Sequence, residues 1–110
     1  CLPHAGGAFP WLVGRLHRGW EKREELRHLK LDGPVAYLRR FYYDTVGYSD
    51  DVLDYLARVI GADRVLMGSD FCFPIAYEQP VGIVTKHPTL DEDAKHRIVG
   101  ANARRLLKLS

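Results

Sequence analysis

The chain has 110 residues, is 46% hydrophobic and 27% charged, and carries a formal net charge of +2 with its histidines neutral. This length and balance predict one small, soluble globular domain and exclude a disordered chain. No apolar run is long enough for a transmembrane helix, and basic residues alternate with acidic ones as on solvated helix faces, so we expect a protein that binds neither membrane nor nucleic acid. Two cysteines make no disulfide framework, and we expect a cytoplasmic protein.

A helix is predicted from about Pro10 to Arg27. Pro10 suits a first helical turn because its missing N–H would be unpaired there in any case. The apolar positions that share one face of this helix are Phe9, Leu12, Val13, Leu16 and Trp20. After the chain-breaking "LDGP", the segment "VAYLRR" predicts one short helical turn, and the aromatic "RFYYDTV" predicts a strand.

The second half continues the alternation of helices and strands. Ser49 is a candidate N-cap for a helix whose apolar stripe ends near Ile60, with Gly61 as its stop. "RVLMGSD" predicts a buried strand, and a long proline-containing loop follows it. Thr89 or Asp91 begins a last helical region, interrupted at Gly100. This order predicts right-handed βαβ units and a parallel sheet.

Three polar residues stand where predicted strands end: His4, Asp44 and Asp70. In parallel α/β folds the functional groups gather at these ends. Asp70 could bind a metal, act as a base, or do both, and the glycines after His4 allow close backbone approach. Each residue also has a plainer interpretation: His4 as a turn or packing residue, Asp44 as a structural hydrogen-bond acceptor, and "GSD" as a simple turn.

Two further residues near these positions have ordinary interpretations. Arg15 lies four residues beyond Trp11 and would usually face solvent. Cys72 follows Asp70 by two residues and, without a nearby base, is expected to line a pocket as a small apolar side chain rather than act as a nucleophile.

Four segments in order resemble a known family. They are "HAGGAFPWLVGRL", "YLRRFYYDTVGY", "GADRVLMGSDFCFP" and "GANARRLLKL". Together they resemble the C-terminal part of the amidohydrolase-related family, in the branch with aminocarboxymuconate-semialdehyde decarboxylase and resorcylate decarboxylases. The resemblance implies an α/β chain that forms the C-terminal part of a (β/α)8 TIM barrel, from the end of strand six to helix eight, with residues 1–110 as one incomplete barrel domain.

The resemblance also implies roles for individual residues. His4 matches a proton-transfer histidine, and Asp70 matches an aspartate that ligates a divalent metal, usually zinc, with manganese possible. Arg15 matches an arginine that reaches a substrate carboxylate in the neighbouring subunit, which implies a homodimer or higher oligomer. Phe73 matches a pocket-lining aromatic, although "GSDFCFP" departs from the commoner "GSDYPFP" and puts the pocket shape in doubt.

The family's other metal-binding residues would lie upstream of Cys1, so the sequence resembles a piece of a longer protein that would not hold a metal tightly alone. The resemblance implies a metal-dependent decarboxylase of a small carboxylated substrate. Two alternatives stay open. One is a metal-dependent hydrolase that uses the same residues. The other is a non-catalytic module that pairs its open sheet edges with another chain.

Overall fold

Short parallel strands lie at the centre of the fold. The structure is a computed structural model that describes residues 1–29 and 31–109. Strand β1 (Tyr43–Asp44) pairs in parallel with β2 (Val65–Leu66), with Tyr43 opposite Val65. Leu2 forms a further parallel bridge to Tyr43. The order Leu2, β1, β2 therefore confirms the predicted parallel arrangement, with helices in the connections.

Helices make up most of the remaining chain. The α-helices are α1 (Phe9–Lys22), α2 (Pro34–Leu38), α3 (Asp50–Leu56), α4 (Pro80–Thr85), α5 (Glu92–His96) and α6 (Asn102–Leu107). The 3-10 turns are η1 (His4–Gly6), η2 (Glu24–Leu29) and η4 (Ala62–Arg64), and the π-helical turns are η3 (Ala57–Gly61) and η5 (Arg97–Ala101). Within the described residues, no helix is both long and apolar enough to cross a bilayer.

Several element boundaries differ from the sequence prediction. Helix α1 ends at Lys22 because Arg23 is extended, and a 3-10 segment follows it. Strand β1 is shorter than "RFYYDTV" because a turn after α2 uses the first of those residues. Helix α4 occupies part of the predicted loop. Gly100 does not interrupt the last helical region, since the chain passes through a π-helical turn there.

Other predicted signals are confirmed. Asp91 is the N-cap of α5, where its Oδ1 accepts the Ala94 N–H at 2.7 Å. Gly61 ends its helical segment with a φ of +100°, a conformation that favours glycine. Ser49 precedes α3, but its side chain makes no capping hydrogen bond.

The core is one apolar cluster around the strands. Its buried members are Ala5, Leu38, Tyr43, Leu53, Leu56, Ile60, Val65, Val84, Leu90 and Ile98. Tyr43 is fully buried, its hydroxyl donates to the Leu38 carbonyl at 2.7 Å, and burial raises its pKa to about 12. Buried Asn102 ties α6 to β2, because its Nδ2 donates to the Ala62 and Val65 carbonyls, each at 2.7 Å.

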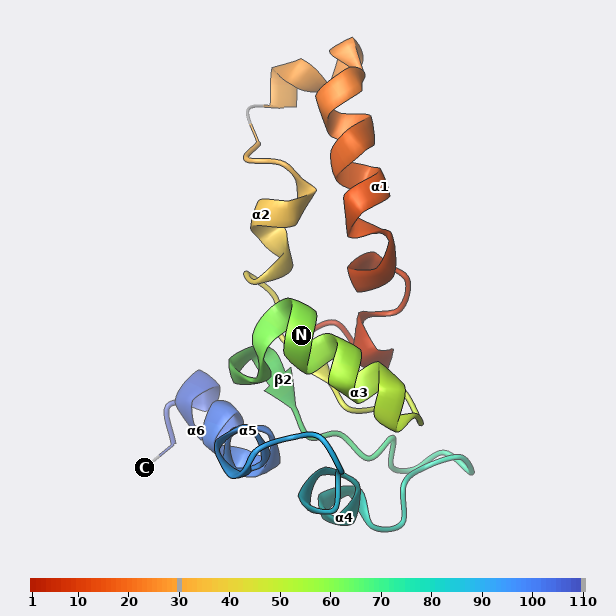
Figure 1. Ribbon diagram of the computed structural model, residues 1–110, viewed down its shortest axis with the longest axis vertical. Helices are drawn as coiled ribbons and strands as arrows, with labels where there is room; N and C mark the ends of the chain where they lie inside the picture. Colours follow the sequence, from red (N-terminus) through yellow and green to blue (C-terminus); the bar gives the residue numbers. More distant parts are fainter. Residues whose placement is uncertain (30, 110) are drawn as a thin grey trace.

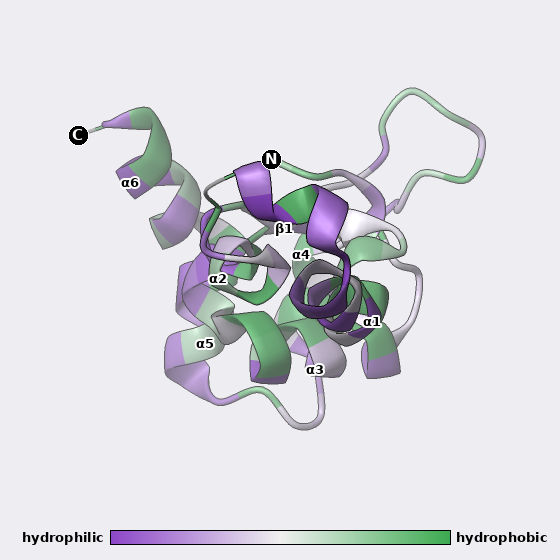
Figure 2. Cartoon of the chain, turned by 90° about the horizontal axis from the view of Figure 1, so that it is seen from above, coloured by the Kyte–Doolittle hydropathy of each residue, from purple (hydrophilic) through white to green (hydrophobic). Residues whose placement is uncertain are grey.

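Two parts of the chain project from this cluster. Helices α1 and α2 lie side by side and form an arm that extends beyond α3 and β2 (Figure 1). The segment between β2 and α4 forms a loop that extends away from the helices (Figure 2). Of the candidate site residues, Asp44 lies in β1 and Asp70 follows β2, whereas Arg15 lies on the arm and Phe73 in the loop.

Candidate functional site

The Asp44 carboxylate holds the turn that carries His4. Asp44 Oδ1 accepts the Ala5 N–H at 2.9 Å and the Val46 N–H at 3.0 Å, and Oδ2 accepts the His4 N–H at 3.1 Å. The end of β1 is thereby joined to the η1 turn. This confirms the interpretation of Asp44 as a structural hydrogen-bond acceptor and leaves the His4 side chain out of the anchoring contacts.

The glycines after His4 meet a steric demand. Gly6 has a φ of +82°, and a Cβ at this position would lie 2.5 Å from Tyr43 Cδ1. Because that separation is far below van der Waals contact, only glycine lets the η1 turn pack on β1. His4 and Ala5 have φ values of 54° and 55°, so the turn also places two residues with side chains in the left-handed region. The segment "HAGG" thus sets the backbone on which the His4 side chain is exposed.

Asp70 follows β2 and points one carboxylate oxygen at a tyrosine. Tyr48 Oη donates to Asp70 Oδ2 at 2.8 Å. Lost hydration and then this hydrogen bond raise the pKa of Tyr48 to about 12, so the phenol is protonated and can donate at neutral pH. Within the described part of the chain, Asp70 Oδ1 has no hydrogen-bond or ion-pair partner.

The loop after Asp70 returns to the same tyrosine. The rings of Tyr48 and Tyr77 have centroids 4.5 Å apart, and the Tyr77 N–H donates to the Ser69 carbonyl at 2.8 Å. Tyr77 therefore closes the loop onto the end of β2 and supports one face of the Tyr48 ring.

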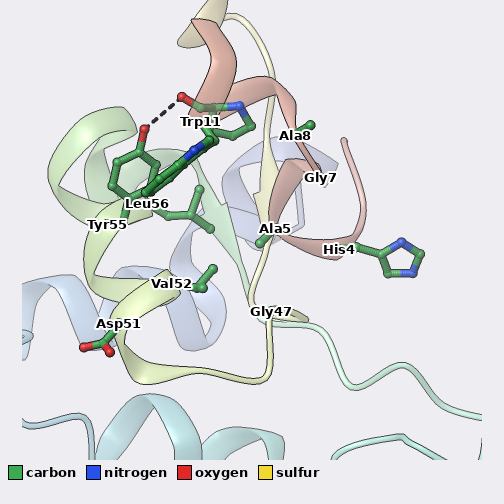
Figure 3. Close-up of a pocket in the computed structure, with 11 residues that line it drawn as sticks. His4, Ala5, Gly7, Ala8, Trp11, Gly47, Asp51, Val52, Tyr55 and Leu56 are labelled. Atoms are coloured by element: carbon green, nitrogen blue, oxygen red, sulfur yellow. Dashed lines mark hydrogen bonds between the residues drawn. The ribbon is translucent and has the colours of Figure 1, made fainter.

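A cavity of about 520 Å³ lies between α1 and α3, next to the His4 turn. Trp11 and Tyr55 form one of its walls, with ring centroids 5.3 Å apart, and Tyr55 Oη donates to the Pro10 carbonyl at 2.9 Å. Figure 3 shows the His4 ring turned away from these two aromatic rings. The His4 imidazole therefore does not point into this cavity.

The two residues expected to bind substrate are both exposed. Arg15 lies on α1 and has no ion pair within the described residues. Phe73, in the loop after Asp70, is 63% exposed. Cys72, two residues after Asp70 in the same loop, is also exposed.

The described residues fit part of a divalent-metal site. Asp70 offers one unpartnered carboxylate oxygen, which is the ligand type that Mn²⁺ and related cations prefer. Among residues 1–29 and 31–109, no three His, Cys, Asp or Glu side chains come together to share an ion. The described residues thus offer Asp70 as one candidate ligand and no complete ligand set.

Sequence reasoning missed two residues that the structure makes prominent. Tyr48 and Asp70, which are joined by a hydrogen bond, have φ values of 53° and 61°, and no sequence signal marks either residue for that conformation. Asn102 had a usable signal: it follows Ile98 by four residues, so it is a polar residue on the buried face of a helix.

Parallel strands joined by helices, with polar side chains gathered where the strands end, define an α/β chain with a candidate site at one sheet edge. The chain belongs to the amidohydrolase family, because the sequence profile described as Amidohydrolase matches residues 1–109. Among curated relatives, the 2-amino-3-carboxymuconate-6-semialdehyde decarboxylase of Dictyostelium discoideum is 28% identical over 110 residues, covering 99% of this chain and 31% of the relative.

Solved structures show the same partial correspondence. The 5-carboxyvanillate decarboxylase of Sphingomonas paucimobilis is 29% identical with a TM-score of 0.81, covering 98% of this chain and 33% of that one. A dihydroxybenzoic acid decarboxylase from a Polaromonas species, solved with manganese and 2-nitroresorcinol, is 24% identical with a TM-score of 0.80, covering 97% of this chain and 32% of that one. The chain therefore spans about a third of the length of these relatives.

Proposed function

We propose that the protein carrying this chain is a metal-dependent decarboxylase, a carbon–carbon lyase, that acts on a small carboxylated substrate. The observation that carries the proposal is the placement of His4 and Asp70 at the ends of parallel segments in a chain similar to decarboxylases. In this proposal residues 1–110 supply strand six to helix eight of a (β/α)8 barrel, and Asp70 is one metal ligand. Manganese is preferred over zinc because the Polaromonas decarboxylase holds manganese.

The chemistry assigned to each residue follows from what decarboxylation requires. A bound divalent cation supplies Lewis-acid polarisation of a substrate oxygen near the leaving carboxylate. The bond between the substrate carbon and its carboxylate breaks, carbon dioxide leaves, and the electron pair stays on the carbon. His4, whose imidazole is exposed at the sheet edge, delivers a proton to that carbon. A hydrolase would use the same two residues, but the relatives named above favour the lyase.

Two variants of the full reading frame that carries this chain test these roles. Asp70→Asn is expected to lose metal and activity together, because an amide keeps the size of the carboxylate but not its charge. His4→Ala is expected to keep its metal while turnover falls roughly 10²–10⁴-fold, the usual contribution of a general acid–base group. Metal content is measured beside carbon dioxide release from 5-carboxyvanillate and 2-amino-3-carboxymuconate-6-semialdehyde. Metal loss in His4→Ala would make His4 a ligand and contradict the assignment.

Variants of Arg15 test, in the same assay, whether the protein recognises its substrate through a carboxylate. A guanidinium binds a carboxylate through two parallel hydrogen bonds, which lysine cannot reproduce. Arg15→Lys is therefore expected to raise KM while metal content is unchanged, with Arg58→Lys, at another exposed arginine, as control. Because Arg15 is proposed to act across a subunit interface, mixed Arg15→Ala and His4→Ala subunits should recover activity. Wild-type kinetics in Arg15→Ala would remove this support for a carboxylated substrate.

A further inference from the structure

Asp70 is held by one oxygen and open at the other. Its Oδ2 accepts the Tyr48 hydroxyl at 2.8 Å, while Oδ1 has no partner within the described residues. An aspartate side chain, with two rotatable bonds, would otherwise be free to reorient in the segment after β2. The hydrogen bond to Tyr48 removes that freedom and fixes which oxygen faces outward.

The backbone is committed to this contact from both sides. Tyr48 and Asp70 have φ values of 53° and 61°, in the left-handed region that residues with a Cβ seldom adopt. Such conformations are strained and concentrate at functional sites. Tyr48 lies in the segment after β1 and Asp70 in the segment after β2, so the two neighbouring strand ends are turned toward each other.

The Tyr48 ring is also fixed in place. Its centroid lies 4.5 Å from that of Tyr77, with the ring planes inclined at 35°. Tyr77 is in turn tied to the end of β2 by its N–H, which donates to the Ser69 carbonyl at 2.8 Å. The hydroxyl that reaches Asp70 thus belongs to a ring supported by the loop that follows Asp70.

We propose that Tyr48 is a positioning residue for Asp70, holding Oδ2 so that Oδ1 is presented to a divalent cation. The inference rests on the proposed function, in which Asp70 is a metal ligand. Tyr48 would act through Asp70 and touch neither metal nor substrate. If Tyr48 only stabilised the fold, removing its hydroxyl would leave the Kd for Mn²⁺ unchanged. The effect on folding stability would also be small, because Tyr48 is 42% exposed and one exposed hydrogen bond adds little to stability.

The test is a Mn²⁺ titration of the full-length protein after metal removal, with free Mn²⁺ followed by electron paramagnetic resonance. Tyr48→Phe keeps the ring against Tyr77 and removes only the donor. We expect its Kd for Mn²⁺ to rise about 10–100-fold, the usual cost of losing a partner of a metal ligand, with metal-free Tm unchanged. The matched control is Tyr55→Phe, which loses a hydroxyl hydrogen bond to the Pro10 carbonyl and should leave the Kd unchanged.

The double variant Tyr48→Phe/Asp70→Asn separates positioning from general destabilisation. If Tyr48 acts through Asp70, the double variant binds Mn²⁺ no more weakly than Asp70→Asn alone. Additive losses, or a wild-type Kd in Tyr48→Phe, would overturn the inference. An unchanged Kd in Asp70→Asn would instead overturn the metal assignment of the proposed function, so the two failures are distinguishable.

Discussion

At the scale of single residues, the carboxylates of Asp44, the last residue of β1, and Asp70, in the segment after β2, have different hydrogen-bond partners. Asp44 uses both oxygens to accept three backbone N–H groups, from His4, Ala5 and Val46. Asp70 uses one oxygen to accept a side-chain hydroxyl and leaves the other unpartnered within the described residues. The strand-end rule predicted that both residues would lie near the site, because parallel strands end at the same edge. It could not assign their roles, since these depend on contacts with residues distant in sequence.

Asp44→Asn tests the anchoring of the His4 turn. In the variant, the amide NH2 would face a backbone N–H that a carboxylate oxygen accepts in the native chain. The negative charge that strengthens all three hydrogen bonds would also be lost. We expect the free energy of unfolding to fall by about 1–3 kcal/mol, in line with hydrogen bonds to charged groups. Chemical denaturation of the full-length protein measures it.

Asp32→Asn is the matched control, because Asp32 pairs with Arg40 at 3.3 Å on an exposed surface. Its effect should stay below about 1 kcal/mol. Equal losses in the two variants would show that Asp44 is no more than another surface carboxylate.

At the scale of elements, the order of helices and strands was predictable, and their lengths were not. Apolar periodicity located α1 and α3, and the Asp91 cap located α5. Each strand has two residues, fewer than predicted, because a strand extends only where a neighbouring segment pairs with it. That pairing cannot be inferred from the sequence of one segment. Helix α4 was missed because all six residues of "PVGIVT" are Pro, Gly or β-branched, which local propensity does not assign to a helix.

A pair of glycine substitutions tests the local packing of these elements. Gly6→Ala should destabilise strongly, because a Cβ would lie 2.5 Å from Tyr43 Cδ1 and the residue has a φ of +82°. Gly14→Ala, within α1, places its Cβ in open space and should stabilise by roughly 0.5–1 kcal/mol. Thermal unfolding of the full-length variants measures both. A Gly6→Ala protein as stable as wild type would contradict the close approach of the η1 turn to β1.

At the scale of the whole molecule, the described chain is extended for its size. Its radius of gyration is 15.5 Å, and its longest dimension is 47 Å. A compact domain of this length would have a radius of gyration of roughly 13 Å. The excess comes from the α1–α2 arm and the loop after Asp70, where Trp11, Phe71 and Ile75 are 73%, 87% and 66% exposed. Apolar surface of this extent is typical of a face that another part of a protein covers.

The 110-residue chain expressed alone should therefore melt broadly and bind a dye for apolar surfaces. The same surface in the full-length protein should be covered, so dye fluorescence per molecule should be much lower there. Scanning calorimetry and dye titration, run on both proteins, compare them. A sharp two-state transition from a monomer of the short chain would contradict this prediction.

The anchoring of the η1 turn through backbone N–H groups has a consequence for how the site could change. Asp44 accepts a hydrogen bond from the backbone N–H of residue 4, and no described contact uses the His4 ring. The stability of the turn therefore depends little on which side chain stands at position 4. The remaining restriction is a φ of 54°, which asparagine and aspartate tolerate and β-branched residues do not. The residue at position 4 can thus be replaced, in evolution or in the laboratory, without redesign of the fold around it.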